Sequence, residues 1–240
     1  MQENQTQILD AIFHRRAVKV FESVEISEDQ RELILEAVRF APSSFNMQPY
    51  CFYWVQSPPM RQRAAELCMG QSPAKTASAL IVAVADIGSW QSTTQSFLQW
   101  VRQSGLSRQK VSEHERRAKF GKWFFVQGWF GVLGMLKWII LRTLHLRRII
   151  GMAPVSRHGL FKWATKNTSL ACENLLIAAE ALGFNTCPME GFDGRRLSKF
   201  LGLQSRYHEI VMVIAVGKKS AGYVEEPRWR RPLDRTVTFL

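Results

Sequence analysis

Apolar residues along this chain fall into two recurring patterns, one with helical spacing and one of short unbroken runs. Helical spacing predicts helices at five places: residues 7–13, 27–41, 60–69, 170–182 and 195–201. Short, mostly apolar runs predict strands at four places: residues 51–55, 79–85, 185–191 and 209–216. The run at 79–85 has no polar residue at all, which is typical of a strand buried on both faces.

Local signals at the ends of these stretches sharpen the predicted boundaries. Ser27-Glu28-Asp29-Gln30 has the composition of a capping box, and Pro42 ends the helix that follows it. Gly183 directly follows the helical pattern of residues 170–182, as a C′ glycine does. Because helices alternate with mostly apolar strands, the order predicts an α+β or α/β protein with a layered sheet.

Charge is distributed unevenly along the 240 residues, which carry a net charge of +12. Residues 88–166 hold 14 of the 32 basic residues and 2 of the 20 acidic ones, so the remainder has 18 of each. The same stretch contains six of the eight tryptophans. We therefore expect a neutral body, residues 1–87 and 168–240, and a basic, Trp-rich helical insertion at residues 88–167.

Several classes of protein lack support in the sequence. The four cysteines have no CxxC spacing and no histidine at metal-ligand spacing, so we expect reduced thiols, no metal site and a cytoplasmic protein. The N-terminus has no signal-peptide pattern. Neither a GxGxxG turn nor a P-loop is present, and no Ser-His-Asp, Cys-His or HExxH arrangement stands out. Chemistry without an evident acid, base or nucleophile indicates a cofactor that brings its own reactivity.

Polar residues gather in four clusters, each in a loop or tail. They are Arg15/Arg16/Lys19, Ser43/Ser44/Asn46/Gln48, Pro188-Met189-Glu190-Gly191 and Arg228/Arg230/Arg231. The two basic clusters come from opposite ends of the chain and are suited to converge on one phosphate, since arginine makes bidentate contacts with phosphate oxygens. The plain alternative is that each basic cluster is a solvated surface feature.

Four segments in sequence order give the chain a resemblance to a known family. RRAVKVF, APSSFNMQPY, PMEGF and the basic C-terminal tail resemble the FMN-dependent nitroreductase family, whose usual motifs look like RRSxRxF, APSxxNxQPW and PxEG. The resemblance covers roughly residues 7–86 and 168–235. It implies an α+β fold with a central, mostly antiparallel sheet flanked by helices, and an interlocked homodimer.

The resemblance also implies which residues bind FMN. Arg15 and Arg16 would hold the phosphate and ribityl chain, and Lys19 would lie near the flavin N1/O2 edge, where its charge stabilises the reduced flavin. Ala17 stands where the family usually has serine, so one hydroxyl contact is missing. Arg228 and Arg230 would complete the phosphate site.

Two further segments and one glutamine belong to the implied site. The loop with Pro42, Ser43, Ser44 and Asn46 would reach the flavin across the dimer interface. The Glu190 backbone N–H would face flavin N5, in the turn of Pro188, Met189 and Gly191, where glycine permits a close backbone approach. Gln71 would hydrogen-bond to the flavin ring or ribityl chain.

The activity implied is ping-pong reduction of a nitroaromatic, quinone or similar conjugated acceptor. NADH or NADPH would transfer hydride to flavin N5 and leave before the acceptor binds, so no catalytic side chain is required. Two alternatives stay open: another flavin chemistry of the family, such as reductive dehalogenation or dehydrogenation, and a membrane-surface flavin-binding protein with weak turnover. The second is favoured only by Ala17.

The insertion adds a feature that the resemblance does not explain. Residues 122–136 and 138–141 are almost continuously apolar, with basic residues on both sides. A membrane-spanning helix needs about 20 apolar residues, and this stretch is interrupted by Gln127 and Lys137. We expect residues 116–148 to lie on an anionic membrane surface, on the inner face of the membrane. Burial against the dimer partner and a soluble partner protein are the alternatives; nucleic acid is not expected.

Overall fold

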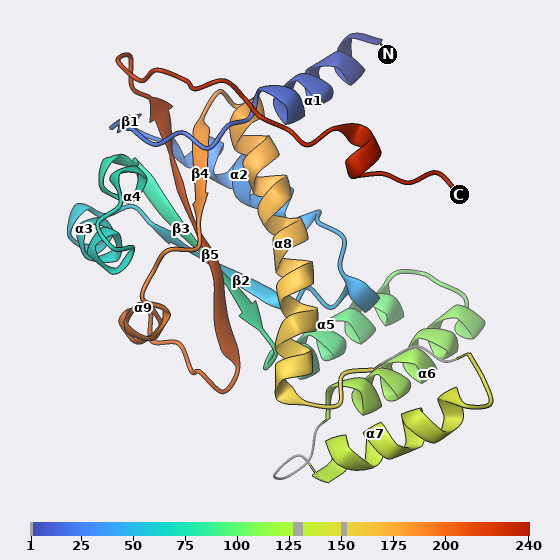
Figure 1. Ribbon diagram of the computed structural model, residues 1–240. Helices are drawn as coiled ribbons and strands as arrows, with labels where there is room; N and C mark the ends of the chain where they lie inside the picture. The colour runs from blue at the N-terminus through green and yellow to red at the C-terminus, as the bar shows by residue number, and fades with distance from the viewer. Residues whose placement is uncertain (1, 127–131, 150–152) are drawn as a thin grey trace.

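The computed structural model describes residues 2–126, 132–149 and 153–240, and its centre is an antiparallel sheet (Figure 1). The strands run in the order β1-β5-β3-β2, and β4 also pairs with β5. Their bounds are β1 Phe21–Glu22, β2 Tyr50–Val55, β3 Ala79–Asp86, β4 Asn185–Met189 and β5 His208–Lys219. Every strand pair is antiparallel, so the predicted α+β class with an antiparallel sheet is confirmed.

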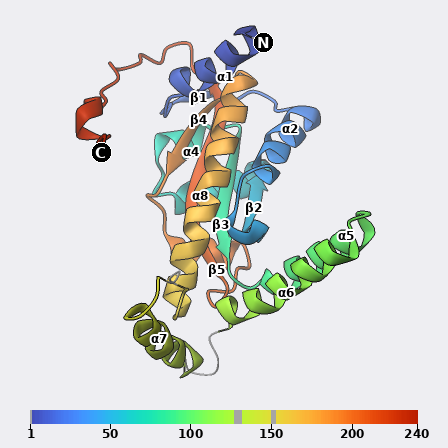
Figure 2. The same ribbon diagram turned by 90° about the vertical axis from the view of Figure 1, so that its right-hand side faces the viewer.

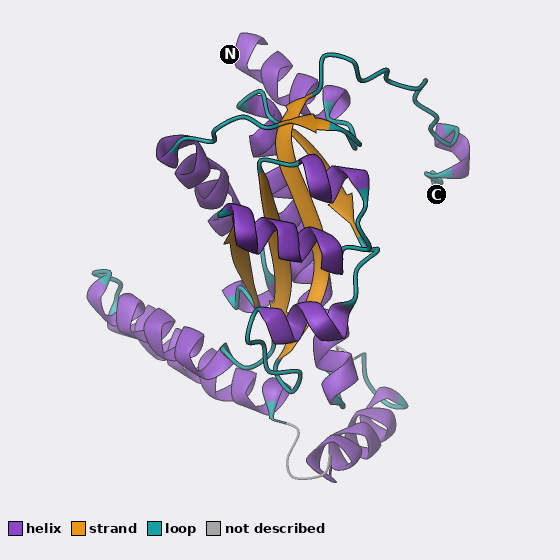
Figure 3. Ribbon diagram, turned by 90° about the vertical axis from the view of Figure 1, so that its left-hand side faces the viewer, coloured by secondary structure: helices purple, strands orange, loops and turns teal. Residues whose placement is uncertain are grey.

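Helices cover both faces of the sheet. One face carries α1 (Gln2–His14), α2 (Glu28–Arg39) and α8 (Arg157–Ala181). The other carries three shorter helices, α3 (Pro58–Leu67), α4 (Ser72–Thr76) and α9 (Gly194–Phe200), which cross the front of the sheet in Figure 3. Successive residues of β3 enter opposite cores: Leu80 and Val82 face the core beneath α3, while Ala79 and Ile81 face the core beneath α8. This two-sided burial explains the unbroken apolar run.

The middle of the chain forms α5 (Trp90–Gln103), α6 (Arg108–Phe125) and α7 (Val132–His145). Figure 2 shows α5 and α6 as a pair that projects from one end of the sheet, with α7 beyond the start of α8. Residues 127–131, the centre of the predicted apolar stretch, lie outside the described residues. Within the described ranges no helix is long and apolar enough to cross a membrane.

The starts of two helices show where the local sequence signals predict a boundary correctly and where they do not. The Ser27 hydroxyl accepts a hydrogen bond from the Gln30 N–H at 3.2 Å, and Gln30 Oε1 accepts one from the Ser27 N–H at 3.1 Å, so the predicted capping box is confirmed. Helix α8, however, starts at Arg157 instead of residue 170, with Ser156 as its N-cap. The helix therefore crosses the expected boundary at residues 167/168.

Candidate functional site

A basic cavity lies where the N-terminal segment meets the C-terminal tail. Its volume is about 570 Å³. The residues that line it are Arg15, Arg16, Ala17, Lys19, Tyr223, Val224, Glu226, Pro227, Arg228, Trp229 and Arg230. The structure thus brings together the two basic clusters from opposite ends of the sequence.

Arg228 fastens the tail to the N-terminal segment. Its Nη2 donates to the carbonyl oxygens of Arg15 at 2.9 Å and His14 at 3.2 Å, and its Nη1 donates to the Phe13 carbonyl. Three carbonyls at the end of α1 are unpaired within the helix, and a guanidinium fork is well suited to bind them. In this structure Arg228 therefore holds the two walls of the cavity together.

The two arginines of the N-terminal motif differ in their surroundings. Arg15 Nη1 is buried and has no hydrogen-bond partner among the described residues. Arg16 Nη2 donates to the Glu226 carbonyl at 2.5 Å, and Nη1 lies 3.6 Å from the Glu225 carboxylate. A hydrogen bond from Lys219 lowers the pKa of Glu225, and the charges of Arg16 and Arg228 add to that shift. Arg15 Nη1 is thus a donor that remains available to a ligand, although the Arg15 charge also acts on the Glu180 carboxylate.

The backbone after these arginines is joined to strand β4. Ala17 forms a bridge with Thr186, and the Val18 N–H donates to the Thr186 carbonyl at 3.0 Å. Lys19 Nζ lies 3.5 Å from Cys187 Sγ. Burial raises the pKa of the Cys187 thiol, and the Lys19 ammonium opposes the shift. Strand β4 therefore carries the basic cavity at its start.

The turn Pro188-Met189-Glu190-Gly191 begins at the other end of β4. Gln71 Nε2 donates to the Gly191 carbonyl at 2.6 Å and to the Cys68 carbonyl at 3.0 Å. A Cβ at Gly191 would lie 2.9 Å from that Nε2, so only glycine lets the amide sit here. Gln71 therefore braces the turn, and Glu190 is exposed beside it. From Thr186 to Glu190 the strand spans about 13 Å.

The loop with Pro42, Ser43, Ser44 and Asn46 lies at the opposite end of the sheet from the basic cavity. Thr186 is level with Ala79 through their shared partner Val216, whereas Tyr50, just after the loop, pairs with Ala85. Six residues of β3 separate the two levels, about 20 Å. Within one chain, the structure does not bring this loop to the arginines.

The loop has an unusual backbone held by the N-terminal half of α8. Phe45 and Asn46 have φ of 60° and 54°, in the left-handed region that few non-glycine residues adopt. The Ser44 N–H donates to Asn167 Oδ1 at 2.7 Å, and Asn167 Nδ2 donates to the Trp163 carbonyl at 2.7 Å. Asn167 is buried, so this contact fixes the loop against α8.

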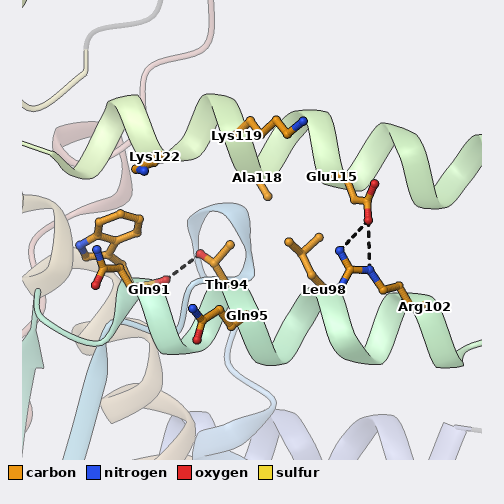
Figure 4. Close-up of a pocket in the computed structure, with 10 residues that line it drawn as sticks. Gln91, Thr94, Gln95, Leu98, Arg102, Glu115, Ala118, Lys119 and Lys122 are labelled. Atoms are coloured by element: carbon orange, nitrogen blue, oxygen red, sulfur yellow. Dashed lines mark hydrogen bonds and ion pairs between the residues drawn. The ribbon is translucent and has the colours of Figure 1, made fainter.

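Two hollows adjoin the insertion, and the smaller one also adjoins the loop. A hollow of about 270 Å³ is lined by Phe45, Asn46, Met47, Thr94, Phe97, His114, Arg117, Ala118, Gly121 and Phe125. A groove of about 550 Å³ runs between α5 and α6, and Figure 4 shows the Arg102–Glu115 ion pair, 2.7 Å long, closing one end. The smaller hollow places insertion side chains beside the 42–46 loop.

Sequence reasoning missed three contributors to these sites. Asn167 lies in an apolar helical stretch with no motif around it, and Glu226 acts through its backbone carbonyl. Trp229 stands between Arg228 and Arg230, and the charge pattern of this segment predicts a role for the arginines only. No cluster of three or more His, Cys, Asp or Glu side chains suited to a metal occurs in the described part of the chain.

Comparison with known proteins bears on the family and the fold. Residues 12–218 match the sequence model of the Nitroreductase family. The chain is 29% identical over 234 residues to "Putative NAD(P)H nitroreductase YfkO" of Bacillus subtilis (strain 168), covering 95% of this chain and 94% of the relative. It is 26% identical over 230 residues to "NADH dehydrogenase" of Thermus thermophilus, covering 95% and 94%.

A solved structure shows the same fold. The crystal structure described as a "putative nitroreductase in complex with FMN", from Exiguobacterium sibiricum 255-15, superimposes with a TM-score of 0.72 at 22% identity and covers 97% of this chain and 96% of that one. At that identity the likeness concerns the fold. Because the family match spans most of the sequence, this chain belongs to the nitroreductase family.

Proposed function

We propose that this protein is an FMN-dependent oxidoreductase that oxidises NADH or NADPH and reduces a nitroaromatic, quinone or similar conjugated acceptor. The observation that carries the proposal is the basic cavity, in which buried Arg15 Nη1 has no partner among the described residues. The names of the relatives, an NAD(P)H nitroreductase and an NADH dehydrogenase, support the choice of donor.

The residues present fit FMN, which has a phosphate at one end and a flat ring at the other. Arg15, Arg16 and Arg230 line the cavity beside the start of β4, and the buried Arg15 Nη1 is a hydrogen-bond donor that a phosphate oxygen would satisfy. The Glu190 turn lies about 13 Å along the strand. The site thus separates a phosphate-binding end from an end where the backbone is open to a flat ring.

The chain's own residues bind and orient the cofactor in this proposal. Arg228 fixes the cavity walls, Gln71 holds the Glu190 turn, and Lys19 adds positive charge between the two ends. Bound FMN would supply the redox chemistry, taking a hydride from the nicotinamide donor and delivering electrons to the acceptor in a separate half-reaction. No protein acid or base is required for this role.

The 42–46 loop takes part only in a homodimer. In this proposal a second copy supplies the loop, because β5 and β3 lie between β4, beside which the arginines and the Glu190 turn lie, and β2, which follows the loop. Its left-handed residues and its tie to buried Asn167 give it a fixed shape. A monomer would therefore bind FMN more weakly than a dimer.

The experiment is an FMN titration of the cofactor-stripped protein, followed by NADH and NADPH oxidation with a quinone or a nitroaromatic acceptor. Arg15→Gln removes a charged contact worth about 2 kcal/mol, so FMN affinity falls roughly 30-fold. The control is Arg31→Gln, since Arg31 is on α2 and its side chain pairs with the exposed Glu28 carboxylate. A purified protein without flavin that FMN cannot reconstitute would overturn the proposal.

A further inference from the structure

Helix α7 has its polar and apolar sides reversed relative to a helix that packs on a protein core. Its buried residues are Gly134, Lys137 and Leu141, which share one narrow stripe at helical spacing. Its exposed residues include eight large apolar side chains: Val132, Leu133, Met135, Leu136, Trp138, Ile139, Ile140 and Leu144. The apolar surface therefore faces away from the protein.

The buried lysine shows that this orientation is built in. Lys137 is 4% exposed, and its Nζ donates to the carbonyls of Val126 and of Phe124, the latter at 3.5 Å, and lies 5.2 Å from the Trp123 ring centre. These carbonyls are at the C-terminal end of α6, where a helix lacks hydrogen-bond donors and attracts cations. Burial lowers the pKa of Lys137. Because this lysine fastens α7 to α6, the apolar side of α7 cannot turn inward without losing those contacts.

Positive charge lies at one end of the apolar face. Arg142, Arg147 and Arg148 are exposed in the last turn of α7 and directly after it. Apolar and aromatic side chains with flanking Lys and Arg are the features by which a helix lies in the surface of an anionic bilayer. At 14 residues α7 is about 21 Å long, too short to cross a hydrocarbon core of about 30 Å.

We propose that the outer face of α7 docks on an anionic lipid membrane, with the helix lying in the interface. The charges favour this occupant over a second α7. If α7 packed on α7 of a second copy across a two-fold axis, the same patch would meet itself, and Arg142, Arg147 and Arg148 would approach the arginines of the copy. A lipid surface instead supplies the opposite charge to these residues and an apolar layer to Trp138 and Ile139.

The test is co-sedimentation of the full chain with vesicles of phosphatidylcholine alone or mixed equally with phosphatidylglycerol. We expect binding to the mixed vesicles that weakens with salt, and weak binding to the neutral ones. The double variant Trp138→Gln, Ile139→Gln should lose more than about 30-fold in affinity, because two apolar anchors are removed. Its matched control, Leu33→Gln with Phe40→Gln, alters two exposed apolar residues on or next to α2 and should bind as the parent does.

A charge variant tests the second half of the proposal. Arg147→Gln with Arg148→Gln should weaken binding to the mixed vesicles about 25-fold, since each basic residue near an anionic surface contributes a factor of about five. The control is Arg195→Gln with Lys199→Gln on α9, which is also exposed and basic. Light scattering of the same proteins without vesicles measures the oligomeric state, which should not change. A parent that ignores anionic vesicles, or an α7 variant that changes only the oligomeric state, would overturn the proposal.

Discussion

Strand β3 and helix α7 are both strongly apolar, yet the fold treats them in opposite ways. Every residue of β3 from Ala79 to Ala85 is fully buried between two helical layers. In α7 every large apolar residue except Leu141 is exposed, and the one lysine is buried. Hydrophobicity along a sequence therefore tells how much apolar surface must leave water, but not whether protein or another phase will cover it.

The largest difference between the two regions is expected from one matched substitution. Ile81→Ala in β3 removes a fully buried side chain and should lower the free energy of unfolding by about 2–5 kcal/mol. Ile139→Ala in α7, where 45% of the side chain is exposed, should change it by less than about 0.5 kcal/mol. Urea unfolding at one protein concentration measures both. Equal losses would show that α7 is covered in solution.

Thiol chemistry gives a second contrast, because all four cysteines lie in the body and none in the insertion. Burial raises the pKa of Cys51 and of Cys68 to about 11, and that of Cys172 to about 12. At pH 8 the thiolate fraction of each is lower than that of an ordinary thiol by a factor of about 100 or more. A cysteine introduced by Ile139→Cys should thus react with DTNB about 100-fold faster than these three. Labelling of all sites at one rate would contradict the burial.

The same thiols make the folding stability depend on pH in the alkaline range. Since their pKa values are raised in the folded state, their contribution to stability is complete below the unfolded value near 9. It is lost as the pH rises from there toward 11 and 12, because the unfolded chain releases its protons first. Urea midpoints measured at increasing alkaline pH should therefore fall, and Cys172→Ala should reduce the slope.

Replacing glycine by alanine should change the free energy of unfolding in opposite directions at two positions. Gly191→Ala places a Cβ 2.9 Å from Gln71 Nε2 and should cost about 1–2 kcal/mol of unfolding free energy and weaken FMN binding, as the amide loses its carbonyl partners. In a Gln71→Ala background the loss should be smaller, which a double-mutant cycle measures. Gly121→Ala in α6 meets nothing within 4 Å and should stabilise by up to about 1 kcal/mol.

The smallest expected change in stability comes from substitutions at the N-caps of two helices in the body. Ser27→Ala removes the hydroxyl that accepts a hydrogen bond from the Gln30 N–H and should cost about 1 kcal/mol. Ser57 is the N-cap of α3, but its side chain makes no cap hydrogen bond, so Ser57→Ala should cost less than about 0.5 kcal/mol. Thermal unfolding compares the two variants. A larger loss at Ser57 would contradict the assignment of the caps.

Local sequence patterns predicted the helices and strands whose buried residues recur at a regular spacing. The unbroken run of β3 and the capped helix after Ser27 are examples, and the predicted fold family is confirmed. The first half of α8 was missed because Lys162 and Lys166 interrupt the buried positions Leu160 and Trp163. The two-residue strand β1 exists only through its pairing with β5, a contact that no local pattern contains.

The candidate site was only partly visible in the sequence. Arginine clusters at opposite ends of the chain were expected to converge, and they line one cavity, while their binding of phosphate stays a prediction. Arg228 and Gln71 both donate hydrogen bonds to backbone carbonyls. These carbonyls come near the two side chains only when the chain has folded. Sequence motifs name side chains and say little about such backbone partners.

The bond between Arg228 and the Arg15 carbonyl joins residues 213 positions apart, which has a consequence for synthesis of the protein. Every described strand and both helical layers are therefore made before residue 228 is added to the nascent chain. Until then the basic cavity lacks one wall, and Arg15 lacks the contact that fixes its backbone. Cofactor loading therefore becomes a late event, and a chain released before residue 228 should be a folded but colourless product.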